Sequence, residues 1–366
     1  MKYLHNAGLY IHIPFCKSKC AYCDFYSSFL NEHLKEEYIA ALIKEIKKWG
    51  GLLDRPIDSI YVGGGTPSVL GDGIEKILSA VYDNFDVCKS AEITAEVNPA
   101  VLIGDFLTSA KRAGVNRLSI GMQSGIEEEL KILKRNHTVD ETKTTFYSAR
   151  KLGFENISLD LMMCLPKSSL KTLEKSLDFL FELEPEHVSA YMLSIEPNTA
   201  FAKQKELDLP DEEEQSEQYL YVCEKLEQKG YEHYEISNFA KSGFESRHNN
   251  KYWKQEEYLG IGPSAHSFLD GKRFFYPRDV KEFIKNPSTV FDEEGGSKQE
   301  AIMLGLRLKS GVRLWNISKE TSFYIKKLET AGLVKFCDNI LSLTDKGMLV
   351  SNNIITEITE LVYENL

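Results

Sequence analysis

Short apolar runs alternate with longer segments of helical period from the N-terminus to about residue 195. In the first long segment, Leu34, Tyr38, Leu42 and Ile46 recur every fourth residue, a spacing that predicts one buried helix face. Six strand-then-helix units indicate a parallel sheet with right-handed crossovers, either doubly wound or rolled into an incomplete barrel. The apolar runs predict six buried strands, at residues 9–13, 59–62, 92–96, 117–120, 157–162 and 187–192.

The pattern changes after about residue 200. Pro210 and the acidic residues 211–214 are typical of a solvated helix start rather than a metal site. From Ser297 the chain predicts a winged-helix-like module, in which two short strands flank a tight turn at Asp338 and Asn339. The expected elements of this module are a helix at 300–308, a helical segment at 315–328, strands at 333–336 and 340–343, and a last helix from Thr344. The expected domains are residues 1–200, 201–296 and 297–366.

Composition narrows the class of protein. The chain has 366 residues, of which 42% are hydrophobic, enough for a packed core and more than one domain. Its net charge of −11 and the lack of a basic stripe argue against a broad electrostatic interface with nucleic acid. No secretory segment and no apolar stretch of membrane-spanning length is visible, so we expect a soluble protein. Free cysteines without a pairing pattern favour the cytoplasm; they are Cys88, Cys164, Cys223 and Cys337.

Three further cysteines form a C-x3-C-x2-C run directly after the first predicted strand: Cys16, Cys20 and Cys23. Three thiolates this close together can hold three corners of a [4Fe–4S] cluster and leave one iron open to another ligand. A zinc knuckle is the alternative, with His12 as the fourth ligand, or three unrelated core cysteines. Zinc usually has four Cys or His ligands, often as two C-x2-C pairs, so the run favours the cluster.

A glycine-rich loop follows the second predicted strand, in the sequence Gly63-Gly64-Gly65-Thr66-Pro67. Glycines allow a ligand to approach the backbone closely and expose its N–H and C=O groups. The loop matches neither a Walker A motif nor G-x-G-x-x-G, and a plain turn is the alternative. Its place one strand after the cysteine run favours a binding function.

Polar residues also occur at or after the later strands, where a β/α barrel places its site. They are Glu96, Gln123 and Asp160, with Arg135 between the last two. A carboxylate can accept hydrogen bonds from ribose hydroxyls, and an arginine can bind a carboxylate. Together these residues predict a site for a polar, charged cofactor.

These motifs resemble the radical SAM family, and specifically its coproporphyrinogen-oxidase-like branch, along nearly the whole chain. The resemblance implies a partial (β/α)6 TIM-type barrel with a C-terminal α+β extension and a winged-helix-like module. It also implies a [4Fe–4S] cluster on the three cysteines and S-adenosylmethionine (SAM) at the open iron. The residues that would line the SAM site are Tyr10, Tyr22, Gly64, Gly65, Thr66, Glu96, Gln123, Arg135 and Asp160.

Two readings exist within this branch. Oxygen-independent coproporphyrinogen III oxidases have a further cysteine where this chain has Phe25, whereas HemW-like haem chaperones have phenylalanine there. The chaperones also carry an HNxxYW motif, which matches residues 248–253. The resemblance therefore implies haem as a third cofactor, with His248 as its ligand, although His266 could compete and a satisfied loop histidine is the alternative. Cys164 departs from the glycine usual in relatives, which leaves the local loop shape open.

The sequence thus favours a haem chaperone that binds a [4Fe–4S] cluster, SAM and haem and delivers haem to recipient haemoproteins. The first alternative is an oxygen-independent coproporphyrinogen III oxidase. The second is a radical SAM enzyme that acts on an unrelated substrate.

Overall fold

A parallel sheet forms the centre of the computed structural model, which describes residues 6–99, 103–204, 206–315 and 317–363. The strands of the sheet follow one another in chain order, and each pairs in parallel with the next. A doubly wound sheet would reverse its strand order, so this order is that of an incomplete barrel, as the sequence predicted. The strands are β1 (Ala7–Ile13), β4 (Ile57–Gly64), β5 (Val87–Val97), β6 (Arg117–Gln123), β7 (Asn156–Met163) and β8 (His187–Met192).

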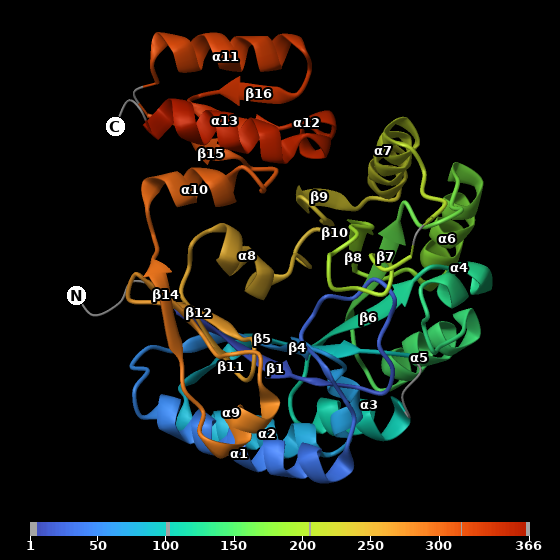
Figure 1. The fold of residues 1–366 in the computed structure, drawn as a ribbon, viewed down its shortest axis with the longest axis vertical. Helices are drawn as coiled ribbons and strands as arrows, with labels where there is room; N and C mark the ends of the chain where they lie inside the picture. The colour runs from blue at the N-terminus through green and yellow to red at the C-terminus, as the bar shows by residue number, and fades with distance from the viewer. Residues whose placement is uncertain (1–5, 100–102, 205, 316, 364–366) are drawn as a thin grey trace.

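Helices cover the outside of this sheet (Figure 1). The expected stripe of the first helix is confirmed, because Tyr38, Leu42 and Ile46 are fully buried. Asn31 and Ser169 begin two of the helices by accepting a hydrogen bond from a backbone N–H of the first turn. The helices are α1 (Glu32–Gly50), α2 (Gly73–Asn84), α3 (Ile103–Arg112), α4 (Glu127–Ile132), α5 (Val139–Lys151) and α6 (Leu170–Leu183).

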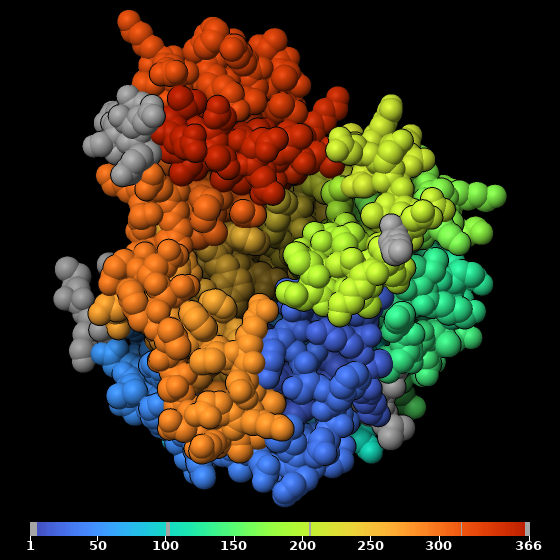
Figure 2. All heavy atoms as spheres, in the orientation of Figure 1, coloured from blue at the N-terminus to red at the C-terminus, as the bar shows by residue number. Residues whose placement is uncertain are grey.

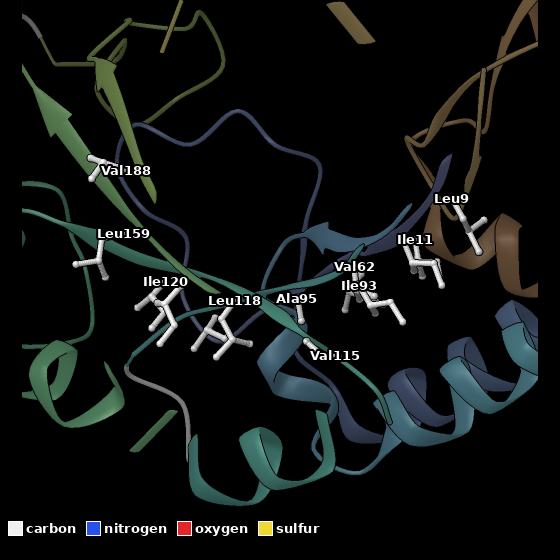
Figure 3. Packing of buried hydrophobic residues seen from close by; sticks show 14 of the residues in the cluster. Leu9, Ile11, Val62, Ile93, Ala95, Val115, Leu118, Ile120, Leu159 and Val188 are labelled. Atoms are coloured by element: carbon white, nitrogen blue, oxygen red, sulfur yellow. The ribbon is translucent and has the colours of Figure 1, made fainter. Parts of the chain in front are cut away.

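The two faces of the barrel strands differ in chemistry. Side chains that point toward the helices are apolar and buried, among them Leu9, Val62, Leu118 and Val188 (Figure 3). Because side chains alternate along a strand, every second residue points to the inside of the barrel, and many of these are polar. The inward residues include Ser59, Tyr61, Glu96, Arg117, Ser119, Asp160 and Ser189. The inside of the barrel is therefore a polar site and not a second apolar core.

Residues after the sixth strand extend the sheet at both edges to twelve strands. Beyond β8 lie β10 (Asn238–Ala240) and β9 (Glu232–Glu235), and α7 (Glu212–Gln228) begins at its predicted acidic turn with a capping box from Asp211. Beyond β1 lies β11 in parallel, followed by three antiparallel strands. These elements are β11 (Tyr258–Ile261), β12 (His266–Leu269), β13 (Lys272–Phe275) and β14 (Val290–Glu294), with α8 (Arg247–Trp253) before them and α9 (Val280–Lys285) among them.

The C-terminal module combines helices with a three-stranded sheet, and the predicted hairpin turns at Asp338 and Asn339, both with positive φ. The helical segment expected from residue 315 begins later, at Lys319, because Ser318 caps it. The sequence also gave no sign of the short strand β15, which completes this sheet. The elements are α10 (Lys298–Gly305), β15 (Val312–Arg313), α11 (Lys319–Thr330), β16 (Val334–Cys337), β17 (Ile340–Leu343), α12 (Asp345–Leu349) and α13 (Ser351–Tyr363).

Backbone hydrogen bonds join this module to the edge of the main sheet. The N–H of Ile236 donates to the carbonyl of Arg307, and the N–H of Lys309 donates to the carbonyl of Tyr234. An isolated β-bridge between Glu235 and Leu308 lies between these two bonds. No described helix is long and apolar enough to cross a membrane.

Candidate cofactor site

A cavity of about 670 Å³ occupies the inside of the barrel and reaches the carboxyl ends of the strands. Figure 2 shows a hollow bounded by the blue N-terminal segment, the yellow-green residues and the orange strands, with the gold segment that includes α8 at its floor. The cavity brings together most of the residues that the sequence singled out: Cys16, Cys20, Tyr22, Cys23, Gly64, Gly65, Thr66, Glu96, Gln123, Arg135 and Asp160. Tyr10 and His248 are not among its lining residues.

The cysteine loop is closed by a short parallel pair, β2 (Phe15–Cys16) and β3 (Ser28–Phe29). Donors from other elements reach its sulfurs. The Thr66 hydroxyl donates to Cys16 Sγ at 3.4 Å, and Arg135 Nη1 donates to Cys20 Sγ at 3.3 Å. Burial nevertheless raises the pKa of the Cys23 thiol to about 11. A bound metal would displace this proton and stabilise the thiolate.

The number of ligands distinguishes a cluster from a single zinc ion. The motif offers three thiolates, whereas zinc usually has four Cys or His ligands. Three thiolates can hold a [4Fe–4S] cluster and leave one iron open, so the residues present fit such a cluster. Among the described residues, Cys223, His233 and Asp345 form a separate group of possible metal ligands away from the cavity.

His12 is also unsuited to be a fourth zinc ligand. Its Nδ1 shares a hydrogen bond of 2.9 Å with the Tyr10 hydroxyl, and its Nε2 lies 3.0 Å from the carbonyl oxygen of Tyr26. Burial lowers the pKa of His12 to about 4, so the ring is neutral. Tyr10 thus acts in the site by fixing His12 beneath the glycine loop.

The glycine loop packs against the cysteine loop. Gly64 has a φ of 115°, and a Cβ there would lie 2.5 Å from the His12 ring. The N–H of Gly65 donates to the carbonyl of Ile13 at 2.8 Å, and a Cβ on Gly65 would lie 2.7 Å from the carbonyl oxygen of Phe15. From the sequence, we expected these glycines to let a ligand approach the backbone closely. In the structure, they also allow the glycine loop to pack closely against the cysteine loop.

Two partly buried acids face the cavity. Glu96 accepts hydrogen bonds from the Tyr61 hydroxyl and from the N–H of Gly64, both at 3.0 Å. Burial, and then the charge of Asp160, raises the pKa of Glu96 to about 7. Asp160 accepts from the Ser119 hydroxyl at 3.1 Å, and burial raises its pKa to about 6. A cationic group that entered the cavity would favour the ionised form of both acids.

Arg135 is partly buried and donates hydrogen bonds to several acceptors of the protein. Besides the bond to Cys20, its Nη2 donates to Asn98 Oδ1 at 3.3 Å and to the carbonyl of Gly121 at 3.0 Å. Gln123 nearby has a φ of 66°, where the register between β6 and β7 shifts. A bulge of this kind re-aims a side chain at the end of a strand, here into the cavity.

His248 occupies a different environment from the one that the sequence suggested. It is 0% exposed and lies on α8, near the starts of β1 and β4. Its Nδ1 shares a hydrogen bond with the Ser59 hydroxyl and its Nε2 shares one with the Tyr252 hydroxyl, both at 2.9 Å. Burial lowers its pKa to about 3. Both ring nitrogens are engaged, so ligation of haem iron by His248 would require at least one of these two hydrogen bonds to break.

His266, the competing histidine, is exposed. Its ring stacks on Phe275, with ring centroids 5.2 Å apart. It borders a second cavity of about 360 Å³ that Tyr258 and Arg273 also line. Of the two histidines, His266 presents its ring to solvent in this structure.

Other cavity residues escaped the sequence analysis, although a signal for them existed. Tyr61, Arg117 and Ser119 are inward positions of β4 and β6, and Asn249 belongs to the HNxxYW motif. Tyr191 also lines the cavity. The alternation of apolar and polar residues along each strand would have identified the strand positions.

The structure shows the surroundings of two residues whose effect the sequence left open. Phe25 lies in the cysteine loop beside the cavity and is 70% exposed. Cys164 is buried, does not line the cavity, and has a φ of 59° in the left-handed region that glycine favours. Its N–H donates to Gln218 Oε1 at 3.1 Å, which fixes the loop in this conformation.

Comparison with known families agrees with this geometry. The model of the radical SAM superfamily matches residues 10–180, and that of the HemN C-terminal domain matches residues 299–350. The chain is 36% identical to the haem chaperone HemW of Bacillus subtilis, over 94% of this chain and 97% of the relative. It is 34% identical to HemW of Lactococcus lactis over 94% and 95% of the two chains, and 40% identical to HemW of Escherichia coli over 72% and 71%.

Among solved structures, coproporphyrinogen III oxidase (HemN) from Escherichia coli superposes with a TM-score of 0.83. The match covers 99% of this chain and 91% of the oxidase, at 23% identity. At this level of identity the likeness shows a shared fold.

Proposed function

Because this chain belongs to the HemW family of the radical SAM superfamily, we propose that it is a haem chaperone that binds haem and delivers it to recipient haemoproteins. The observation that carries the proposal is the cavity itself, which gathers the three motif cysteines, the glycine loop and Arg135 inside the barrel of a HemW relative.

Cys16, Cys20 and Cys23 would hold a [4Fe–4S] cluster through three of its irons. The bound cluster supplies an electron and an open iron position for SAM. Thr66 and Arg135 donate hydrogen bonds toward two of the sulfurs and so stabilise their thiolate forms.

The remaining predicted residues would hold SAM around this iron. Arg135 suits its carboxylate, while Glu96 and the backbone of the Gly64–Thr66 loop suit its ammonium group. Asp160 and Gln123 also line the cavity and would suit a ribose hydroxyl as acceptor and donor. Tyr22 lines the cavity beside the cysteines, and the Tyr10 hydroxyl shares a hydrogen bond with His12 under the loop.

We expect one of two histidines to be the axial ligand of the haem iron. The HNxxYW motif implies His248, which must first lose its hydrogen bond to Ser59 or to Tyr252, depending on which nitrogen binds the iron. His266 needs no such rearrangement, because it is already exposed. Replacing each histidine in turn by alanine identifies the ligand, because loss of an axial ligand shifts the Soret band and weakens haem binding.

The test of the function is haem uptake by the anaerobically reconstituted protein, followed by transfer to an apo-haemoprotein. We expect a Soret band on uptake that shifts in either His248→Ala or His266→Ala. A shift in His248→Ala alone would mean that α8 opens to admit haem, and a shift in His266→Ala alone would assign the ligand to β12. If the wild type takes up no haem, the chaperone proposal is wrong.

The second candidate is an oxygen-independent coproporphyrinogen III oxidase, which the shared fold favours. Phe25 opposes it, because the oxidases resembled here have a cysteine at this position. Purified protein with SAM, reductant and coproporphyrinogen III should form no protoporphyrinogen IX. Formation over many turnovers would replace the chaperone proposal by the oxidase. The same assay without product, and without haem uptake, would leave a radical SAM enzyme for an unrelated substrate.

A further inference from the structure

Arg117 is the first residue of β6 and the largest fully buried side chain of the described residues, at 2% exposure. It lines the barrel cavity, yet its Nε has no hydrogen-bond partner in the described part of the chain. No ion pair among the described residues includes it. Since a buried charge without a partner is costly, this arginine is poised for an anion that enters the cavity.

Two other partly buried arginines are bound by acceptors of the protein. Arg135, in the same cavity, donates to Cys20, Asn98 and Gly121. Arg150 forms an ion pair with Glu186, in which Nη2 donates to both carboxylate oxygens. Arg117 lines the same cavity as Arg135, but its Nε has no such acceptor among the described residues.

The position of Arg117 separates it from the cluster. Arg117 begins β6 at the amino end of the barrel, and Gln123 ends the same strand six residues later at the carboxyl end. The SAM carboxylate would be held at the cluster end by Arg135, and Arg117 is therefore free for a different carboxylate. Asn249 of α8 also lines the cavity and offers an amide donor.

The surrounding charges select the type of anion. Asp160 is close enough for the charge of Arg117 to lower its pKa, although burial has the larger, opposite effect. Glu96 lies in the same cavity. A singly charged carboxylate is repelled less by these acids than a phosphate dianion would be.

We propose that the inner part of the cavity is a carboxylate site, with Arg117 as its anchor and Asn249 as a second donor, and that it receives a propionate group of a tetrapyrrole. The carboxylate site follows from the structure alone, and the tetrapyrrole rests on the proposed function. An arginine fork matches a carboxylate bidentately, which gives both affinity and orientation.

The main experiment compares haem with haem dimethyl ester, whose propionates carry no charge, on the reconstituted protein with SAM. The wild type should bind haem at least tenfold more tightly than the ester. In Arg117→Met this ratio should fall to about one while the affinity for the ester is unchanged, and Arg117→Lys should restore part of it. Arg112→Met, which removes an exposed arginine of α3, is the matched control and should keep the wild-type ratio.

A second arm does not depend on haem. Sodium propionate at 0.2 M, compared with sodium chloride at equal ionic strength, should raise the Tm of the wild type and of Arg112→Met by about 1 °C, and leave that of Arg117→Met unchanged. An unchanged haem-to-ester ratio in Arg117→Met would overturn the tetrapyrrole assignment. If the wild type takes up no haem, the proposed function fails and the propionate arm alone decides the site. Equal Tm shifts in wild type and Arg117→Met, or none in either, would then overturn it.

Discussion

Polar side chains at the two ends of the barrel have different surroundings. At the carboxyl end, Glu96 and Cys23 face the open cavity. Near the amino end, α8 closes the barrel, and the polar atoms of His248 are bonded to Ser59 and Tyr252. The Glu92 carboxylate completes this end by accepting from the first N–H groups of α8. Polar residues in a motif thus indicate a binding site only where they also line a cavity.

The HNxxYW motif contains both situations within one helix. His248 points into the protein, whereas its neighbour Asn249 lines the cavity. The motif therefore has a structural half and a half that is available to a ligand. Four experiments, in order of expected effect, test the contrast between the two ends of the barrel.

The largest effect is expected at the cluster cysteines. Replacing Cys16, Cys20 and Cys23 by alanine should abolish assembly of the cluster, because no other described cysteine lines the cavity. Iron and sulfide analysis after anaerobic reconstitution measures this. Cys337→Ala, at an exposed thiol of the C-terminal module, is the control and should keep about four irons per chain. Full retention of iron in the triple variant would move the cluster elsewhere.

The next largest effect is expected at the amino end of the barrel, where α8 carries His248. His248→Ala should lower the free energy of unfolding by about 2–4 kcal/mol, because it opens a cavity and leaves Ser59 and Tyr252 unpaired. Asn249→Ala, one residue away, should cost less than about 1 kcal/mol, since its side chain faces the cavity. Thermal unfolding of the two variants gives the comparison. Equal losses would contradict the division of the motif.

A smaller effect is expected at the glycine loop. Gly65→Ala places a methyl group 2.7 Å from the carbonyl oxygen of Phe15, which should cost about 1–3 kcal/mol and lower the iron content by displacing the cysteine loop. Gly104→Ala is the control, because an added methyl group there meets no atom within 4 Å. Normal iron content with weakened SAM binding would instead show that Gly65 serves the ligand alone.

The smallest effect is a pH dependence of SAM affinity. The pKa of Glu96 is raised to about 7, so the fraction of carboxylate rises with pH across this range. If the carboxylate receives the ammonium group, affinity should increase about fivefold from pH 6 to pH 7, as that fraction grows from about one tenth to one half. Glu96→Gln should bind more weakly and lose this dependence. Calorimetry at pH 6 and pH 7 measures the SAM affinity of the wild type and the variant. An equal rise in affinity in the variant would exclude Glu96 as the titrating group.

The sequence predicted the barrel well because each strand carries its own signal. Runs such as residues 157–162 are apolar and short, and the cysteine spacing is local, so neither depends on distant parts of the chain. The partners of His248 were not predictable, since Ser59 is 189 residues away. The four residues of β11 likewise give no sign that they pair with β1. Arg117 was overlooked because a charged residue at the start of a strand usually reaches solvent.

The junction between the C-terminal module and β9 has a consequence for solubility. A twelve-stranded open sheet has two edges, and an uncovered edge can pair with another chain and aggregate. The edge at β14 is fully exposed but carries Asp292, Glu293 and Glu294, whose charges oppose such pairing. The edge at β9 is instead covered by residues 307–309. A chain that ended before this segment would expose β9 and would be expected to precipitate through edge-to-edge association.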